Sequence, residues 1–281
     1  MVWNFRPSQS SPRPHDGSIA HSSHTSRGSG KAQEAPIPFA YQFVDCRWEL
    51  GDPTRGRELY LAGHIPGASF LDVDVDLSDL SVEGAGRHPL PSAERFAESA
   101  SRAGIGEGVF VVAYGQMGGA ERLWWLLRHF GHDSCAVLQG GIGAWQGPLS
   151  QGAEQIERAY LEPRPRDDDT MSADEIASRL DDNGLFVVDA RPASRWRGKP
   201  NPIDKVPGRI PGAVNVPFTE GNVVPEELLA VPEIVVYCGS GVTSCVTLLA
   251  LAEAGRPDAK LYPGSWSEWE GLGRGFGREV G

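Results

Sequence analysis

The stretch that decides the fold of this 281-residue chain is Tyr237-Cys238-Gly239-Ser240-Gly241-Val242-Thr243-Ser244. Residues 234–237 are β-branched or aromatic and lie between a proline and this glycine-rich loop, which predicts a buried parallel strand. Residues 243–254 then have a helical composition and end at Gly255, a common C-terminal helix signal. Cys238 is therefore expected at the carboxyl end of a strand, facing the N-terminus of a helix.

This placement favours a reactive thiolate at Cys238. The backbone N–H groups of the loop and the positive end of the helix dipole both stabilise an anion. Such surroundings lower the pKa of a thiol from about 8.5 toward neutrality, and the thiolate is the nucleophilic form. Gly239 and Gly241 allow the backbone to curl around the sulfur without a Cβ clash. The alternative interpretation of Cys238 is a buried structural thiol.

The loop at residues 238–243 resembles the active-site loop of the rhodanese superfamily, most closely its 3-mercaptopyruvate sulfurtransferase branch. Other motifs of the superfamily surround it, and the set occurs twice in the same order, so the signal is specific. The first copy is Val44-Asp45-Cys46-Arg47, Gly63-His64-Ile65-Pro66-Gly67-Ala68, a strand at 109–114 and Gly140-Gly141-Ile142-Gly143-Ala144-Trp145. The second copy is Val188-Asp189-Ala190-Arg191, Gly208-Arg209-Ile210-Pro211-Gly212-Ala213, the strand into Cys238, and Gly264-Ser265-Trp266 with Trp269. The resemblance implies an α/β fold of two tandem rhodanese-like domains, each a parallel sheet covered by helices on both faces.

The domain organisation follows from length, composition and the repeat. The chain exceeds a typical domain of ~100–200 residues. We predict a disordered tail at 1–37, a non-catalytic rhodanese-like domain at 38–150, a linker at 151–169 and a catalytic rhodanese domain at 170–281. The tail is rich in Ser, Pro, His, Gly and Arg without apolar periodicity, and the linker combines Gly, Pro and Gln with an acidic cluster. Ser172 and Glu175 predict a capping box at the start of the second domain.

The two halves of the repeat differ at the catalytic position. When the strands that end in Tyr114 and Tyr237 are aligned, Gly115 stands where Cys238 stands. The first domain therefore cannot form a persulfide at that position. In the family this half is a non-catalytic partner that forms one wall of the active-site cleft.

Charge, apolar runs and cysteine spacing exclude several classes of protein. The net charge of −11 argues against nucleic acid or an anionic membrane as a partner. No apolar run approaches the ~20 residues that span a bilayer, so we expect a soluble protein. The cysteines show no C-x-x-C pair or zinc spacing, and we expect a cytoplasmic location. Cys46, Cys135 and Cys245 are interpreted as packing residues, with a redox pair between Cys245 and Cys238 as the alternative.

The resemblance implies a double displacement. The Cys238 thiolate attacks the transferable sulfur of a small-molecule donor, holds it as a persulfide and passes it to a thiol, cyanide or thioredoxin-like acceptor. No metal or organic cofactor is required. Gly239, Gly241, Val242 and Thr243 are the predicted substrate-binding loop, since their amides suit an anionic sulfur.

The donor is inferred from the charge of the loop. Thiosulfate-type members follow the cysteine with Arg and Lys, whereas this chain has Gly239 and Ser240, which favours the monoanion 3-mercaptopyruvate. A thiosulfate-preferring enzyme is the alternative. By resemblance, Ser240 and His64 form a proton relay, with Asp52 as the candidate acid. The alternative for His64 is a histidine that stabilises its turn.

A carboxylate donor also requires cationic side chains. Arg195 matches the family arginine that binds the substrate carboxylate, and a guanidinium suits this geometry. Arg191 is expected in a structural ion pair. Mercaptopyruvate-type members carry a second substrate arginine, but Ile203 stands near that place here, and Lys205 is the candidate substitute.

Other function classes fit the loop less well. A phosphatase on this fold needs Cys-x5-Arg, but the sixth residue after Cys238 is Ser244. The glycines also mimic a dinucleotide fingerprint, although that motif normally opens its domain. A rhodanese module used only for protein interaction typically loses the cysteine that this chain keeps. Arsenate reductase remains an open alternative.

Overall fold

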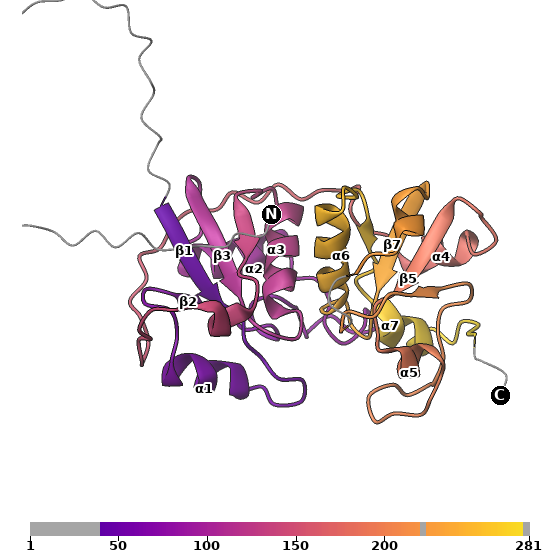
Figure 1. Cartoon of the computed structure of the whole chain (residues 1–281), viewed down its shortest axis with the longest axis horizontal. Helices are drawn as coiled ribbons and strands as arrows, with labels where there is room; N and C mark the ends of the chain where they lie inside the picture. Colours follow the sequence, from indigo (N-terminus) through magenta and orange to yellow (C-terminus); the bar gives the residue numbers. More distant parts are fainter. Residues whose placement is uncertain (1–39, 220–222, 278–281) are drawn as a thin grey trace, which may run out of the picture.

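The computed structural model describes residues 40–219 and 223–277, which form two four-stranded parallel sheets (Figure 1). The strand orders are β2-β1-β3-β4 and β6-β5-β7-β8. The first sheet and its helices comprise β1 (Ala40–Asp45), α1 (Arg55–Ala62), β2 (Ser69–Phe70), α2 (Ala93–Arg102), β3 (Val109–Tyr114), α3 (Gly119–His129), β4 (Cys135–Val137) and η1 (Gly141–Ala144). The second comprises α4 (Ala173–Ser178), β5 (Leu185–Asp189), α5 (Ala193–Trp196), β6 (Val214–Asn215), η2 (Glu226–Leu229), β7 (Glu233–Tyr237), α6 (Ser244–Glu253), β8 (Lys260–Leu261) and α7 (Ser265–Gly271).

The two sheets have equivalent strand orders and share an equivalent side-chain hydrogen bond. The hydroxyl of Tyr114 at the end of β3 accepts from Ile65 N at 3.2 Å, and that of Tyr237 at the end of β7 accepts from Ile210 N at 3.1 Å. Both isoleucines belong to the Ile-Pro-Gly-Ala turns quoted above. The tandem α/β fold predicted from the duplicated motifs is therefore confirmed.

Helices α3 and α6 lie side by side between the two sheets (Figure 1). Almost all residues of α6 are buried, because one side of this helix packs on its own sheet and the other on α3. A single apolar cluster includes Trp124 and Leu127 from α3 together with Leu248 and Leu249 from α6. The two halves therefore share one continuous core.

Within residues 40–219 and 223–277, the first sheet is covered less completely than the second. A cavity of about 700 Å³ lies against it, lined by apolar side chains that include Tyr41, Phe43 and Trp145. In the second half, Met171 and Ile176, from the segment around α4, pack into the corresponding cluster. The chain that precedes β1 lies outside the described residues, and so does the predicted tail.

The segment between the two halves follows the surface of the first. Residues 151–169 contain no helix or strand, and hydrogen bonds such as Gly152 N to Leu61 O (2.9 Å) and Arg164 N to Phe130 O (2.9 Å) attach them. The predicted capping box is present, with Ser172 and Glu175 each accepting from the other's backbone N–H. In the described parts of the chain, no helix combines the length and the apolar character that crossing a membrane requires.

Candidate active site

Cys238 follows β7 directly and is only 1% exposed. Its loop is held by the first turn of α7, where Trp266 N and Ser267 N donate to the carbonyls of Cys238 and Gly239, both at 3.0 Å. These bonds turn the loop carbonyls outward and leave its amides facing the sulfur. Gly241 N donates to Cys238 Sγ at 3.2 Å. The predicted cradle of backbone N–H groups is therefore present around the thiol.

The surroundings of Cys238 stabilise its thiolate. Burial by itself would raise the pKa of this thiol, but hydrogen bonds from the Thr243 hydroxyl, the Ser240 backbone and Ser244 outweigh it, and the pKa is lowered from its ordinary value. The opposite holds for Cys245, where burial dominates and raises the pKa to about 12. Cys245 Sγ donates to Gly241 O at 3.4 Å and so supports the loop from behind. Only the first of these two thiols is activated.

One glycine of the loop is required by its conformation. Gly241 has φ of 81°, and a Cβ there would lie 2.4 Å from Pro263 O. Its carbonyl accepts from Nη1 of Arg122 at 3.0 Å. Arg122 belongs to α3 in the first half and is fully buried, and it also donates to the carbonyls of Leu77 (3.3 Å) and His88 (3.2 Å). The loop is thus attached to the other domain through one guanidinium.

Ser240 is paired with a histidine from the first half of the chain. His88 Nδ1 lies 2.7 Å from Ser240 Oγ, and His88 Nε2 lies 2.9 Å from Asp74 Oδ1. Because a carboxylate only accepts, Nε2 carries a proton toward Asp74, and Nδ1, when it carries no proton, accepts from the serine hydroxyl. Asp74, His88 and Ser240 therefore form a continuous hydrogen-bonded chain, an arrangement that can move protons to or from the serine oxygen.

The predicted relay residues His64 and Asp52 have partners other than Ser240. Both ring nitrogens of His64 are engaged elsewhere, Nδ1 with Tyr60 O at 2.8 Å and Nε2 with Glu154 at 3.2 Å, and the ring stacks on Tyr60. Asp52 is exposed and accepts from the backbone and hydroxyl of Thr54. The alternative interpretation of His64, a histidine that stabilises its turn, is the one the geometry supports.

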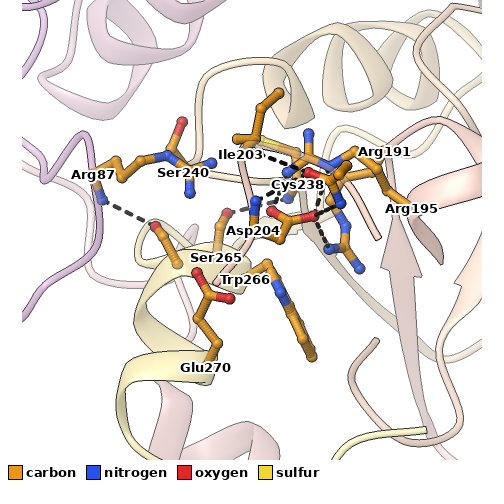
Figure 2. A network of polar contacts seen from close by, with 12 residues as sticks. Arg87, Arg191, Arg195, Ile203, Asp204, Cys238, Ser240, Ser265, Trp266 and Glu270 are labelled. Atoms are coloured by element: carbon orange, nitrogen blue, oxygen red, sulfur yellow. Dashed lines mark hydrogen bonds and ion pairs between the residues drawn. The ribbon is translucent and has the colours of Figure 1, made fainter. Parts of the chain in front are cut away.

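The arginines beside Cys238 are arranged around Asp204 (Figure 2). Arg195 donates from Nε and Nη2 to both oxygens of Asp204, and Nη1 of the fully buried Arg191 lies 3.4 Å from the same carboxylate. Arg191 also pairs with Asp189, as expected for a structural ion pair. Arg195 lies near Gly239, whereas Ile203 and Lys205 are exposed on the loop beyond.

Comparison with known proteins identifies the fold family. Residues 31–148 and 172–272 match the rhodanese-like domain. This chain belongs to the rhodanese family. It is 39% identical over 249 residues to the probable 3-mercaptopyruvate sulfurtransferase of Pseudomonas aeruginosa, covering 80% of this chain and 88% of the relative. The putative thiosulfate sulfurtransferase SseB of Mycobacterium tuberculosis is 38% identical over 251 residues, covering 80% and 86%.

Solved structures agree with this assignment. The crystal structure of SseA from Escherichia coli, described as a 3-mercaptopyruvate sulfotransferase with the rhodanese fold, superimposes with a TM-score of 0.70 at 34% identity. The match covers 81% of this chain and 93% of that one. Together with the intact cysteine loop, these relatives make the chain a rhodanese-family sulfurtransferase.

The other half of this rhodanese-family chain has no nucleophile at the equivalent place. Gly115 follows Tyr114 as Cys238 follows Tyr237, and a Cβ at Gly115 would lie 2.9 Å from Cys46 O. The neighbouring Gly118 packs against the catalytic loop instead, since a Cβ there would lie 2.9 Å from Thr243 Cα. The first domain thus packs on the catalytic loop at Gly118.

Sequence reasoning missed three site residues, Asp74, His88 and Arg122, all from the first domain. Asp74 and His88 lie in a segment between β2 and α2 without regular structure of its own, and Arg122 faces the other domain from inside a helix. The sequence contains one signal that could have indicated His88. Arg87 and His88 are adjacent basic residues in a segment of glycines and prolines, and no role was assigned to them.

Proposed function

We propose that the protein transfers a sulfur atom from 3-mercaptopyruvate to a thiol, cyanide or thioredoxin-like acceptor through a persulfide on Cys238. The observation that carries this proposal is the lowered pKa of a buried thiol inside an uncharged loop, with a serine, histidine and aspartate chain beside it. An uncharged loop that includes Gly239 and Ser240 suits a monoanionic donor.

The first half-reaction breaks a carbon–sulfur bond. The Cys238 thiolate attacks the donor sulfur, a sulfur–sulfur bond forms, and the electron pair of the broken bond remains on carbon as the enolate of pyruvate. The donor thiol loses one proton and the enolate carbon gains one, so the product pair is the persulfide anion and pyruvate. Ser240, in contact with His88, carries that proton between the two sites.

The second half-reaction returns the enzyme to its starting state. The acceptor nucleophile attacks the outer sulfur of the persulfide, and the Cys238 thiolate leaves. Loop amides such as Gly241 N–H favour both anionic forms. The Ser244 hydroxyl, which hydrogen-bonds the Cys238 thiolate, is a second donor to these anions.

The carboxylate of the donor is assigned to Arg195. Asp204 occupies Nε and Nη2 of this side chain and fixes its orientation, which leaves Nη1 to bind an anion beside Gly239. All four cysteines are free thiols, which fits a reducing compartment, and we place the enzyme in the cytoplasm.

Steady-state kinetics with two donors test the proposal. We would measure kcat/KM for 3-mercaptopyruvate and for thiosulfate, with cyanide as the common acceptor, on the wild type and on Cys238→Ser. The expected result is a preference for mercaptopyruvate that Cys238→Ser abolishes and that Cys245→Ser keeps. Near-wild-type transfer by Cys238→Ser would refute the persulfide mechanism, and a preference for thiosulfate would refute the donor assignment.

A further inference from the structure

A short loop of the first domain enters the active site of the second. Gly86 has φ of 90°, and a Cβ there would lie 2.5 Å from Gly264 O, so this loop lies directly on the start of α7. The next residue, Arg87, donates its backbone N–H to Ser267 Oγ at 3.0 Å. The residue after that is His88, which contacts Ser240. The backbone on both sides of Arg87 is therefore fixed relative to the reactive thiol.

The side chain of Arg87 extends toward Ser240 and Cys238 (Figure 2). Its guanidinium lies beside Gly239. A Cβ placed on Gly239 would lie 2.6 Å from Nη2 of Arg87 and 2.9 Å from Nη2 of Arg195. One guanidinium from each domain thus reaches the same point, the open face of the residue that follows the nucleophile. A side chain larger than hydrogen at position 239 would fill the space between them.

Among the described residues, Arg87 lacks the close carboxylate partner that the two neighbouring arginines have. Arg195 is paired with Asp204 and Arg191 with Asp189, but Arg87 Nε is buried without a hydrogen-bond partner. Burial and then the neighbouring Arg195 lower the pKa of Arg87, which reflects the cost of burying a cation and of holding it near a second one. An anion bound between the two guanidinium groups removes that repulsion and completes the hydrogen bonds of both.

We propose that Arg87 and Arg195 together bind the carboxylate of the sulfur donor, so that the first domain supplies half of the substrate-anchoring site. Each carboxylate oxygen then accepts from one guanidinium. This inference rests on the proposed function and extends it, since it fills the role that the family gives to a second arginine. The corresponding place in this chain is Ile203, which is apolar and 37% exposed, so the second cation comes from another part of the chain.

The location of the site also has a consequence for specificity. The donor carbonyl must lie near Ser240, its sulfur near Cys238, and its carboxylate between the two arginines, and these points are arranged around Gly239. A donor without an anionic group gains nothing from Arg87. The benefit of Arg87 is therefore confined to anionic donors, which separates it from a purely structural role.

The test compares two donors that differ only in the anionic group. With 3-mercaptopyruvate, Arg87→Gln is expected to lower kcat/KM by about 10- to 100-fold, chiefly through KM, because one charge-assisted hydrogen bond to the carboxylate is lost. With mercaptoacetone, in which a methyl group replaces the carboxylate, the two proteins are expected to be equal. Arg95→Gln is the matched control, since Arg95 lies in the same domain but pairs with Asp79 at the surface.

Pyruvate binding provides a readout that does not depend on turnover. In a Cys238→Ser background, calorimetry should show a Kd for pyruvate that rises about 10- to 100-fold on adding Arg87→Gln. An unchanged Kd, or an equal loss of kcat/KM with both donors, would overturn the role of Arg87. Inactivity of the wild type toward 3-mercaptopyruvate would instead overturn the proposed function, because the pyruvate titration reports on the anion site alone.

Discussion

Replacing His88 by asparagine tests the proton relay without changing the other residues of the site. An asparagine keeps a polar group near the position of Nδ1, which contacts Ser240 at 2.7 Å, but it cannot reach Asp74 and cannot carry a proton through its side chain. We expect persulfide formation from 3-mercaptopyruvate to slow strongly while attack of cyanide on the persulfide is unchanged, because only the first step needs a proton on carbon.

The size of the effect follows from the contacts of His88. The ring is 4% exposed and its two nitrogens lie 2.7 Å and 2.9 Å from their partners, so water does not replace the relay when it is lost. A positioned acid–base group contributes about 100- to 10,000-fold, which corresponds to about 3 to 5 kcal/mol of transition-state free energy. The assay is single-turnover release of pyruvate, measured alongside cyanide attack on persulfide prepared beforehand.

His64→Asn is the matched control because it makes the same change to another buried histidine of the first domain. Its ring contacts Tyr60 O and Glu154, so this substitution should lower the free energy of unfolding by about 1 to 3 kcal/mol and leave pyruvate release within about twofold of wild type. Equal pyruvate release by His88→Asn and the wild type would refute the relay. A selective loss in His64→Asn would restore the assignment made from the sequence.

Two further predictions concern the thiol and the domain contact. The thiolate forms as the pH rises through the pKa of Cys238, which is lowered from its ordinary value, so the ultraviolet thiolate absorbance that Cys238→Ser removes should appear at a lower pH than that of free cysteine. A midpoint at or above that of free cysteine would contradict the cradle. Cys245 serves as the internal control because burial raises its pKa to about 12. Arg122→Met leaves three buried carbonyls without their hydrogen-bond donor and should lower the free energy of unfolding by about 3 kcal/mol or more. Arg128→Met, on the same helix, should have little effect, because Arg128 pairs with Asp133 near the surface. An unchanged denaturation midpoint for Arg122→Met would refute that role.

The nucleophile could be located from sequence because its whole environment is local. Strand, loop and helix follow one another within residues 234–254, and the bonds that lower the pKa of Cys238 come from residues 240–244. The repeat also made Gly115 predictable. Because each motif occurs twice, the two strands can be aligned, and Gly115 then stands at the position of Cys238. The ion pair of Arg191 was predictable for the same reason, since Asp189 is two residues away.

The partners of Ser240 could not be found in this way. His88 lies 152 residues earlier in the chain, in a loop whose path is set by packing against α7. The Gly-His-Ile-Pro-Gly motif drew attention to His64 because it is part of a recognisable turn, yet its role is to hold that turn together. Contacts across a domain interface depend on how two cores dock, and no local pattern encodes that geometry.

The bond from Arg122 to the carbonyl of Gly241 implies an order of events during synthesis. The first domain leaves the ribosome before the second and generally folds as a unit. The sulfur cradle, by contrast, receives its last support only when α6 docks on α3, after the final turns of the chain around α7 have been made. The bonds that lower the pKa of Cys238 therefore form within the second half, whereas the support of its loop by Arg122 is added once both halves have met.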